Sequence, residues 1–131
     1  TWYPELMQTG GAEYGLNEET AAYVINLLFS RTTSSTAVNI GDLMIIGVPG
    51  ELTAGLGQEI KRKVLGQTDA IYVTIGGLAD EWISYILSKE EYEKGGYEAS
   101  LSFYGPTLGP LFVDRIVDAA TSFQLQLLTK N

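Results

Sequence analysis

Three short apolar segments, with a helical segment between the last two, constrain the fold of this chain more than any other feature. Strands are predicted at Thr36–Ile40, Leu43–Val48 and Ala70–Ile75, because each is a short run rich in aliphatic or β-branched residues. Over Glu51–Leu65, leucine, isoleucine and valine recur at helical spacing. A strand, a helix and a strand in this order form a βαβ unit with parallel strands and a right-handed crossover. We therefore predict an α/β fold whose mixed sheet contains a right-handed βαβ unit and is flanked by helices.

The remaining pattern predicts two further helices and the burial of the last strand. Asn17 is expected to cap a helix over Glu18–Arg31, whose first turn carries two glutamates that suit the helix dipole. The run Ala70–Ile75 is apolar without alternation, which is typical of a strand buried on both faces. A long C-terminal helix is expected over Leu108–Leu128, with an inward face formed by Leu111, Ile116, Ala119, Ala120 and Phe123.

The composition of the chain excludes several kinds of partner and of chemistry. The chain has 131 residues, which fits a single α/β domain over residues 1–131. Its net charge is −8 and its only basic cluster is Lys61-Arg62-Lys63, so we expect no nucleic-acid partner. It contains no Cys and no His, which excludes thiol chemistry and removes the commonest zinc ligand. No apolar run approaches the roughly 18 residues of a membrane span, and no N-terminal signal pattern is present, so the compartment is left open.

Two candidate functional segments follow predicted strands. In a parallel α/β unit, ligands bind at the carboxyl ends of the strands. One such end leads into Glu51, and the other leads into an aromatic segment that includes Trp82 and Tyr85. If the two strands lie close together in one sheet, these side chains meet at the same edge.

Each of these residues also has a purely structural interpretation. Glu51 would favour the dipole of the helix that it starts. Trp82 and Tyr85 would be core aromatic residues with their polar ends at the surface. The acidic residues after the strand ends are typical of solvated loops and turns without a function: Asp80, Glu81, Glu90, Glu91 and Glu93.

Two longer segments carry most of the information about function. The first is PGELTAGLGQEIKRKV, and the second is GGLADEWISYILSKEEYEKGGYEASLSFYGP. They resemble two segments of the neutral/alkaline ceramidases, GE-[FL]-T-T…G…R-x-[LV] and G-x-[AC]-N-x-Y-x-x-Y-[IV]-T-T-x-E-E-Y…Y-E-[AG]…[YF]-G-P. Order and spacing both match from Ile40 to the C-terminal helix. The second segment is specific, because EEY, YEA and YGP at these intervals rarely coincide.

The resemblance implies a zinc-dependent amidase that hydrolyses ceramide to sphingosine and a fatty acid. The family holds its zinc with two His, a Glu and a Tyr. The family's Glu falls on Glu51 and its liganding Tyr falls on Tyr85, so we expect their oxygens to lie roughly 3–6 Å apart. A further family tyrosine, near the active site, falls on Tyr97. We assign Tyr97 a catalytic role, in which its hydroxyl donates to the developing oxyanion.

The chain also departs from the family pattern. The family's Asn is Asp80, the first aromatic residue of that run is Trp82, and the second Thr after the Glu is Ala54. These changes concern the choice of substrate more than the metal site. Because the chain has no His, it is expected to supply half of a zinc site. We expect zinc in the full-length protein, and neither metal nor activity in this chain alone.

The resemblance identifies the chain as the C-terminal portion of a ceramidase-like catalytic domain, and so as part of a larger catalytic domain. The expected partners are a lipid-like amide substrate and the missing N-terminal half of that domain. The chain alone is expected to expose apolar surface and to form a homodimer. The resemblance implies a secreted or membrane-surface protein. Two other functions stay open: a non-enzymatic α/β binding module, and a relative that acts on another amide or ester.

Overall fold

The structure is a computed structural model that describes residues 17, 19–20, 23, 32–79 and 81–128. The chain divides into two units, Thr1–Thr33 and Ser34–Asn131. In the first, the side-chain oxygen of Asn17 accepts hydrogen bonds from the backbone N–H and the hydroxyl of Thr20, each at 2.8 Å. This contact is the helix cap that the sequence predicts. Most of the predicted helix over Glu18–Arg31 lies outside the described residues.

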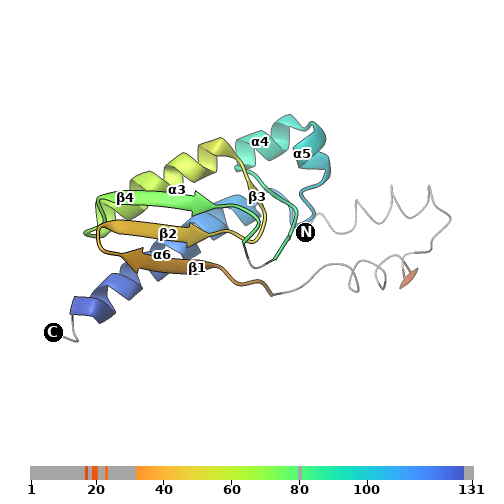
Figure 1. The fold of residues 1–131 in the computed structure, drawn as a ribbon. Coiled ribbons are helices and arrows are strands. Elements are labelled where there is room, and N and C mark those ends of the chain that lie inside the picture. The colour runs from red at the N-terminus through yellow and green to blue at the C-terminus, as the bar shows by residue number, and fades with distance from the viewer. Residues whose placement is uncertain (1–16, 18, 21–22, 24–31, 80, 129–131) are drawn as a thin grey trace. The chain divides into compact units, whose positions relative to one another are not determined.

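A three-stranded mixed sheet organises the larger unit (Figure 1). Its strand order is β1 (Thr36–Ile40), β2 (Leu43–Gly47) and β4 (Tyr72–Gly76). β1 and β2 form an antiparallel hairpin about a turn at Gly41. β2 and β4 are parallel and are connected through α3 (Ala54–Gln67). The α/β class, the mixed sheet and the βαβ connection that the sequence predicts are therefore confirmed.

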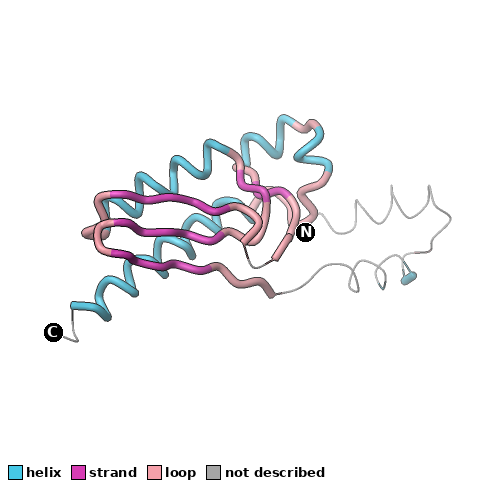
Figure 2. The backbone as a smooth tube through the Cα atoms, in the orientation of Figure 1, coloured by secondary structure: helices cyan, strands magenta, loops and turns pink. Residues whose placement is uncertain are grey.

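A second, much shorter parallel pair lies beyond the carboxyl ends of β2 and β4 (Figure 2). It consists of β3 (Glu51–Leu52) and β5 (Tyr85–Ile86). Glu51 therefore lies in a strand, and α3 begins only at Ala54, after Thr53 as its N-cap. The prediction that the helix begins at Glu51 is wrong, and so is the interpretation of Glu51 as a first-turn residue that favours the helix dipole.

Tertiary hydrogen bonds explain this difference. The backbone N–H of Glu51 donates to the carbonyl of Ser84 at 3.0 Å, and that of Thr53 donates to the carbonyl of Ile86 at 3.1 Å. Helix propensity is a weak preference that tertiary contacts often override. The helical spacing of the following residues is real, but it starts three residues later than the sequence indicates.

Two long helices, α3 and α6 (Leu108–Leu128), cover one face of the three-stranded sheet (Figure 1). The bounds of α6 agree with the prediction, but its buried face is rotated: Leu111 is 54% exposed and Ala119 is exposed. The side chain of Phe123 lies outside the described part of the chain. The core between helices and sheet is almost entirely aliphatic and includes Met44, Ile46, Val48, Leu56, Ile60, Val64, Ile86, Phe112, Val113, Ile116, Val117 and Ala120.

Two short helices, α4 (Lys89–Lys94) and α5 (Tyr97–Ser100), follow β5 and lead to α6. They lie at the end of the sheet where the short strand pair is found (Figure 1). Over the part of the chain that the structure describes, no helix combines the length and the apolarity needed to cross a membrane.

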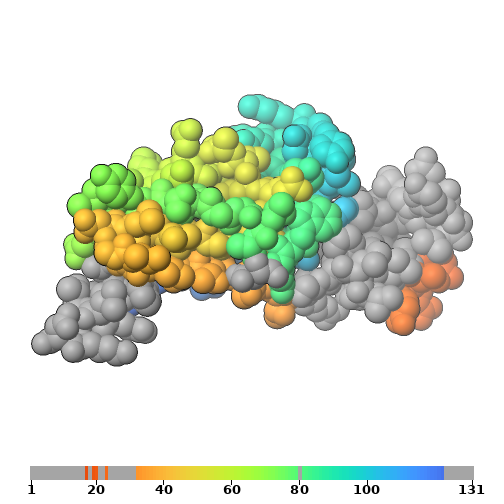
Figure 3. All heavy atoms as spheres, in the orientation of Figure 1, coloured from red at the N-terminus to blue at the C-terminus, as the bar shows by residue number. Residues whose placement is uncertain are grey.

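The sheet face opposite the two long helices is turned toward the viewer in Figure 3, and most of its described side chains are apolar and exposed or half-buried. Its residues form two rows across β1, β2 and β4 in register, Ile40–Leu43–Tyr72 and Val38–Ile45–Thr74. Val38, Ile40 and Tyr72 are 42%, 62% and 66% exposed. β4 is thus exposed on one face and partly buried on the other, and the prediction of burial on both faces is wrong for the residues that the structure describes.

Candidate metal and active site

The segments that leave β2 and β4 run side by side and carry the candidate residues. The backbone N–H of Val48 donates to the carbonyl of Gly76, and the N–H of Ala79 donates to the carbonyl of Val48, each at 2.9 Å. Further along, the N–H of Glu51 donates to the carbonyl of Ser84 at 3.0 Å. The two strand ends therefore converge on one edge of the sheet, as the sequence predicts for this type of unit.

Ser84 directs the second segment into β5. Its φ of 77° lies in the left-handed region that residues other than glycine seldom adopt. Ser84 is fully buried, and its hydroxyl donates to the carbonyl of Leu101. The hydroxyl of Ser102 donates to the carbonyl of Tyr85 at 2.9 Å. Such unusual backbone persists where surrounding contacts hold it, and here the contacts fix the backbone of Tyr85.

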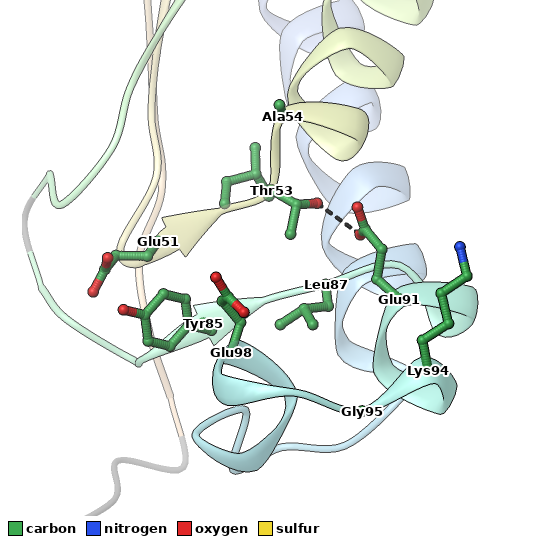
Figure 4. A pocket seen from close by; sticks show the side chains of 10 residues that line it. Glu51, Thr53, Ala54, Tyr85, Leu87, Glu91, Lys94, Gly95 and Glu98 are labelled. Carbon is green, nitrogen blue, oxygen red and sulfur yellow. Dashed lines mark hydrogen bonds between the residues drawn. The ribbon is translucent and has the colours of Figure 1, made fainter.

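Glu51 and Tyr85 are direct partners in the parallel pair β3–β5. Both side chains are half-buried. Figure 4 shows the carboxylate and the phenol on the same side of the pair, pointing in a common direction. The structure thus brings together the two residues that the resemblance identifies as metal ligands, while their binding of a metal stays a prediction.

The environment of Tyr85 affects its protonation. Removal from water raises the pKa of the phenol, and the charge and hydrogen bonding of Glu51, followed by those of Tyr97, raise it further, to about 12. The phenol is therefore protonated at neutral pH in the metal-free site. A bound cation acts in the opposite direction, because it favours the charged form of an oxygen ligand.

Two other aromatic residues surround the pair. The indole Nε1 of Trp82 donates to Oε1 of Glu51 at 3.2 Å. Trp82 is 56% exposed, so its interpretation as a core aromatic residue is wrong. Tyr97 begins α5 and meets the ring of Tyr85 edge to face, with ring centroids 5.8 Å apart and an interplanar angle of 74°. Asp80 lies outside the described residues.

A pocket of about 500 Å³ lies beside the pair (Figure 4). One side is formed by β3 and the first residue of α3, the floor by β5 and the residue that follows, and the other side by α4, α5 and their connection. This volume is within the range of small-molecule sites. The lining residues are Glu51, Leu52, Thr53, Ala54, Tyr85, Leu87, Glu91, Lys94, Gly95 and Glu98.

The sequence interpretation missed the role of Glu91 at this pocket. It is half-buried, and its Oε2 accepts hydrogen bonds from the hydroxyl of Thr53 and the backbone N–H of Ser88, each at 2.9 Å. Its interpretation as part of an exposed turn is therefore wrong, whereas Glu90 and Glu93 are exposed. The signal in the sequence is the S-x-x-E pattern of Ser88 to Glu91, which predicts a capping box and forms one in the structure.

The donor set fits half of a zinc site. Among the described residues, no three His, Cys, Asp or Glu side chains are grouped so that they could hold a metal ion. Glu51 and Tyr85 offer two oxygen donors, whereas zinc in proteins takes about four ligands, most often with His or Cys among them. Because the chain contains neither His nor Cys, nitrogen ligands would have to come from outside it.

Comparisons with known proteins agree on one family. The model described as "Neutral/alkaline non-lysosomal ceramidase, N-terminal" matches residues 21–114. The neutral ceramidase of Pseudomonas aeruginosa is 32% identical over 91 residues, which cover 67% of this chain and 14% of that protein. Neutral ceramidase 1 of Arabidopsis thaliana is 34% identical over 82 residues, which cover 56% of this chain and 10% of that protein.

A solved structure gives the same result. The crystal structure of the Pseudomonas aeruginosa neutral ceramidase superposes with a TM-score of 0.64 at 29% identity, and covers 69% of this chain and 15% of that one. This chain thus spans only a small part of the length of the relatives that it matches. The match to the family model includes β3, β5 and the residues Glu51 and Tyr85. The chain therefore belongs to the neutral/alkaline non-lysosomal ceramidase family.

Proposed function

We propose that this chain is the part of a zinc-dependent amide hydrolase of the neutral ceramidase type that supplies Glu51 and Tyr85 to the metal site. The pairing of these two residues across β3 and β5 is the observation that carries the proposal. Family membership and relatives named as neutral ceramidases support it. The proposed substrate is a lipid-like amide, ceramide, which is cleaved to sphingosine and a fatty acid.

The proposed role of each residue follows from its contacts. Glu51 and Tyr85 offer oxygen donors to zinc, which when bound supplies an acidified water and polarisation of the scissile carbonyl. Trp82 orients the Glu51 carboxylate through its indole N–H. Tyr97 packs against the ring of Tyr85, and its hydroxyl donates a hydrogen bond to the oxygen on which negative charge develops.

The rest of such a protein is proposed to cover the open face of the sheet. Val38, Ile40 and Tyr72 expose a contiguous apolar surface there, and surfaces of this kind mark interaction sites. The match to the Pseudomonas aeruginosa relative covers only 14% of that protein, so other segments are available to pack on this face. Without them, two copies of the chain are proposed to pair through the same face as a homodimer.

Glu51→Ala and Tyr85→Phe in the full-length protein test the proposal. Each should lower zinc content and reduce the rate of ceramide hydrolysis by more than about 100-fold, since loss of an outer-shell partner alone costs 10- to 100-fold. The control variant Glu90→Ala also removes a carboxylate, but at an exposed position away from the pair, and should change neither quantity.

Three outcomes distinguish the possible functions. Loss of zinc and of ceramide hydrolysis in both variants supports the assignment. Full activity and full zinc content after both changes would contradict it and favour a binding module. Zinc binding that depends on Glu51 and Tyr85, with hydrolysis of a different amide or ester, would keep the site and change the substrate.

A further inference from the structure

Glu91 joins the two segments that follow β3 and β5. Its Oε2 accepts a hydrogen bond from the Thr53 hydroxyl and another from the Ser88 backbone N–H, each at 2.9 Å. Thr53 directly follows β3, and Ser88 lies shortly after β5. One carboxylate oxygen therefore connects the residues that follow β3 and β5. The first residues of these two strands, Glu51 and Tyr85, form the candidate metal site (Figure 4).

The hydroxyl of Thr53 serves this contact and does not cap its own helix. Thr53 is the N-cap residue of α3, and a threonine at this position normally accepts a hydrogen bond from the first helical turn. In this structure it makes no side-chain cap hydrogen bond. Its hydroxyl instead donates to a residue 38 positions further along the chain. Local helix capping therefore does not explain this side chain.

The hydrogen bond between Glu91 and Thr53 is also not needed to cap α4. The capping box of α4 is complete without it, because Glu91 accepts from the Ser88 N–H and the hydroxyl of Ser88 accepts from the Glu91 N–H at 3.2 Å. Partial burial opposes the charge of Glu91, but the hydrogen bonds from Ser88 and Thr53 outweigh it and lower the pKa of the carboxyl. The bond from Thr53 is thus charge-assisted, and such bonds are roughly twice as strong as neutral ones.

We infer that Glu91 is a positioning residue for the Glu51–Tyr85 pair, and that it acts through Thr53 to hold β3 in register with β5. The inference rests on the proposed function of that pair. β3 and β5 contribute only two residues each, and such short ladders hold their geometry weakly on their own. Because ligands must be held to within about 0.5 Å by their supporting contacts, a hydrogen bond made directly after β3 affects the site. Glu91 and Thr53 also line the pocket, so the same bond sets its shape.

Thr53→Val tests the Thr53–Glu91 hydrogen bond separately from the helix caps. The change removes the hydroxyl, keeps the shape of the side chain and leaves the capping box of α4 intact. Glu91→Ala removes both the Thr53–Glu91 hydrogen bond and the capping box of α4, whereas Glu91→Gln keeps an oxygen acceptor for both donors. Glu90→Ala is the matched control, because Glu90 is exposed on the same helix turn and does not line the pocket.

The first readout needs no metal. Hydrogen exchange, followed by mass spectrometry on the zinc-free full-length protein, reports opening of the bonds from the amides at positions 51 and 53. Thr53→Val and Glu91→Ala should accelerate exchange in peptides that cover residues 50–54 by about tenfold, the factor expected for loss of a hydrogen bond to a charged group. Peptides from α6 should be unaffected, and Glu91→Gln should restore most of the protection. Unchanged exchange at 50–54, or equal acceleration throughout the protein, would overturn the inference.

The second readout is zinc affinity, measured by competition with a chelator. Thr53→Val and Glu91→Ala should each weaken zinc binding about tenfold, with Glu90→Ala unchanged and the double variant no weaker than Glu91→Ala. Zinc binding that requires Glu51 but is indifferent to Thr53 and Glu91 would overturn the positioning role alone. Zinc binding that is indifferent to Glu51 as well would instead refute the proposed function.

Discussion

Gly50 lies where the chain after β2 packs tightly against the chain before β5, so a methyl group there perturbs the site directly. A Cβ built at Gly50 would lie 2.5 Å from the carbonyl oxygen of Ser84, and 3.3 Å from both Cγ1 of Ile83 and Cδ1 of Ile86. Carbon and carbonyl oxygen ordinarily approach to about 3.3 Å, so the two backbones must separate by about 0.8 Å. The same Ser84 oxygen accepts the hydrogen bond from the Glu51 N–H.

The expected cost of Gly50→Ala follows from these contacts. Forcing extra volume into a packed site costs about 1–3 kcal/mol, and the upper part of this range applies because the obstacle is backbone. Loss of the Glu51–Ser84 hydrogen bond adds about 1 kcal/mol. The lower entropy of the unfolded alanine chain returns about 0.5 kcal/mol. We therefore expect the free energy of unfolding to fall by about 3 kcal/mol.

Urea unfolding of the chain, followed by circular dichroism, measures this change. Gly66→Ala is the control, because a Cβ at Gly66 meets nothing within 4 Å and the residue lies inside α3. That change should stabilise the chain by about 0.5–1 kcal/mol through helix propensity. Equal unfolding midpoints for Gly50→Ala and Gly66→Ala would show that the close approach at Gly50 does not exist.

Two further predictions concern acid stability and self-association. Because the pKa of Glu91 is lowered in the folded state, its contribution to stability is fully present above the ordinary value of 4.5 and is lost as pH falls through the lowered value. Urea midpoints measured from pH 6 downward should therefore fall less steeply in Glu91→Gln than in Glu90→Gln. Parallel curves would contradict a stabilising role for the hydrogen bonds that Glu91 accepts. On the open sheet face, Ile40→Glu should weaken self-association of the isolated chain in sedimentation equilibrium, because it places a charge in the apolar rows. Unaltered association would exclude this face as the contact between copies.

Much of the fold could be predicted from the sequence, because its larger elements have strong periodic patterns. The bounds of β1 and α6 agree with the prediction, and β2 and β4 differ from it by one or two residues. The buried face of α6 was harder to assign, since apolar residues occur on several sides of this helix and only packing against α3 and the sheet selects Phe112, Val113, Ile116 and Val117. Likewise, the apolar run of β4 does not show by itself that one face is open.

The candidate site was predictable only in part. Glu51 and Tyr85 could be expected near each other, because both follow parallel strands. The register that makes them direct partners depends on two strands of two residues each, which are too short to give a periodic signal. Long-range side-chain contacts such as Thr53 with Glu91 and Trp82 with Glu51 depend on the folded geometry. The capping box is the exception, since its spacing is visible in the sequence.

The metal-ligand assignment is tested most directly by a crystal structure of the full-length protein with zinc, in which anomalous scattering at the zinc absorption edge locates the metal. We expect a single strong peak about 2.0–2.2 Å from a carboxylate oxygen of Glu51. The zinc should also contact the phenolic oxygen of Tyr85 and be completed by nitrogen ligands from outside this chain. A zinc ion held by other residues, with Glu51 and Tyr85 both outside its coordination shell, would refute the assignment of these two residues as ligands.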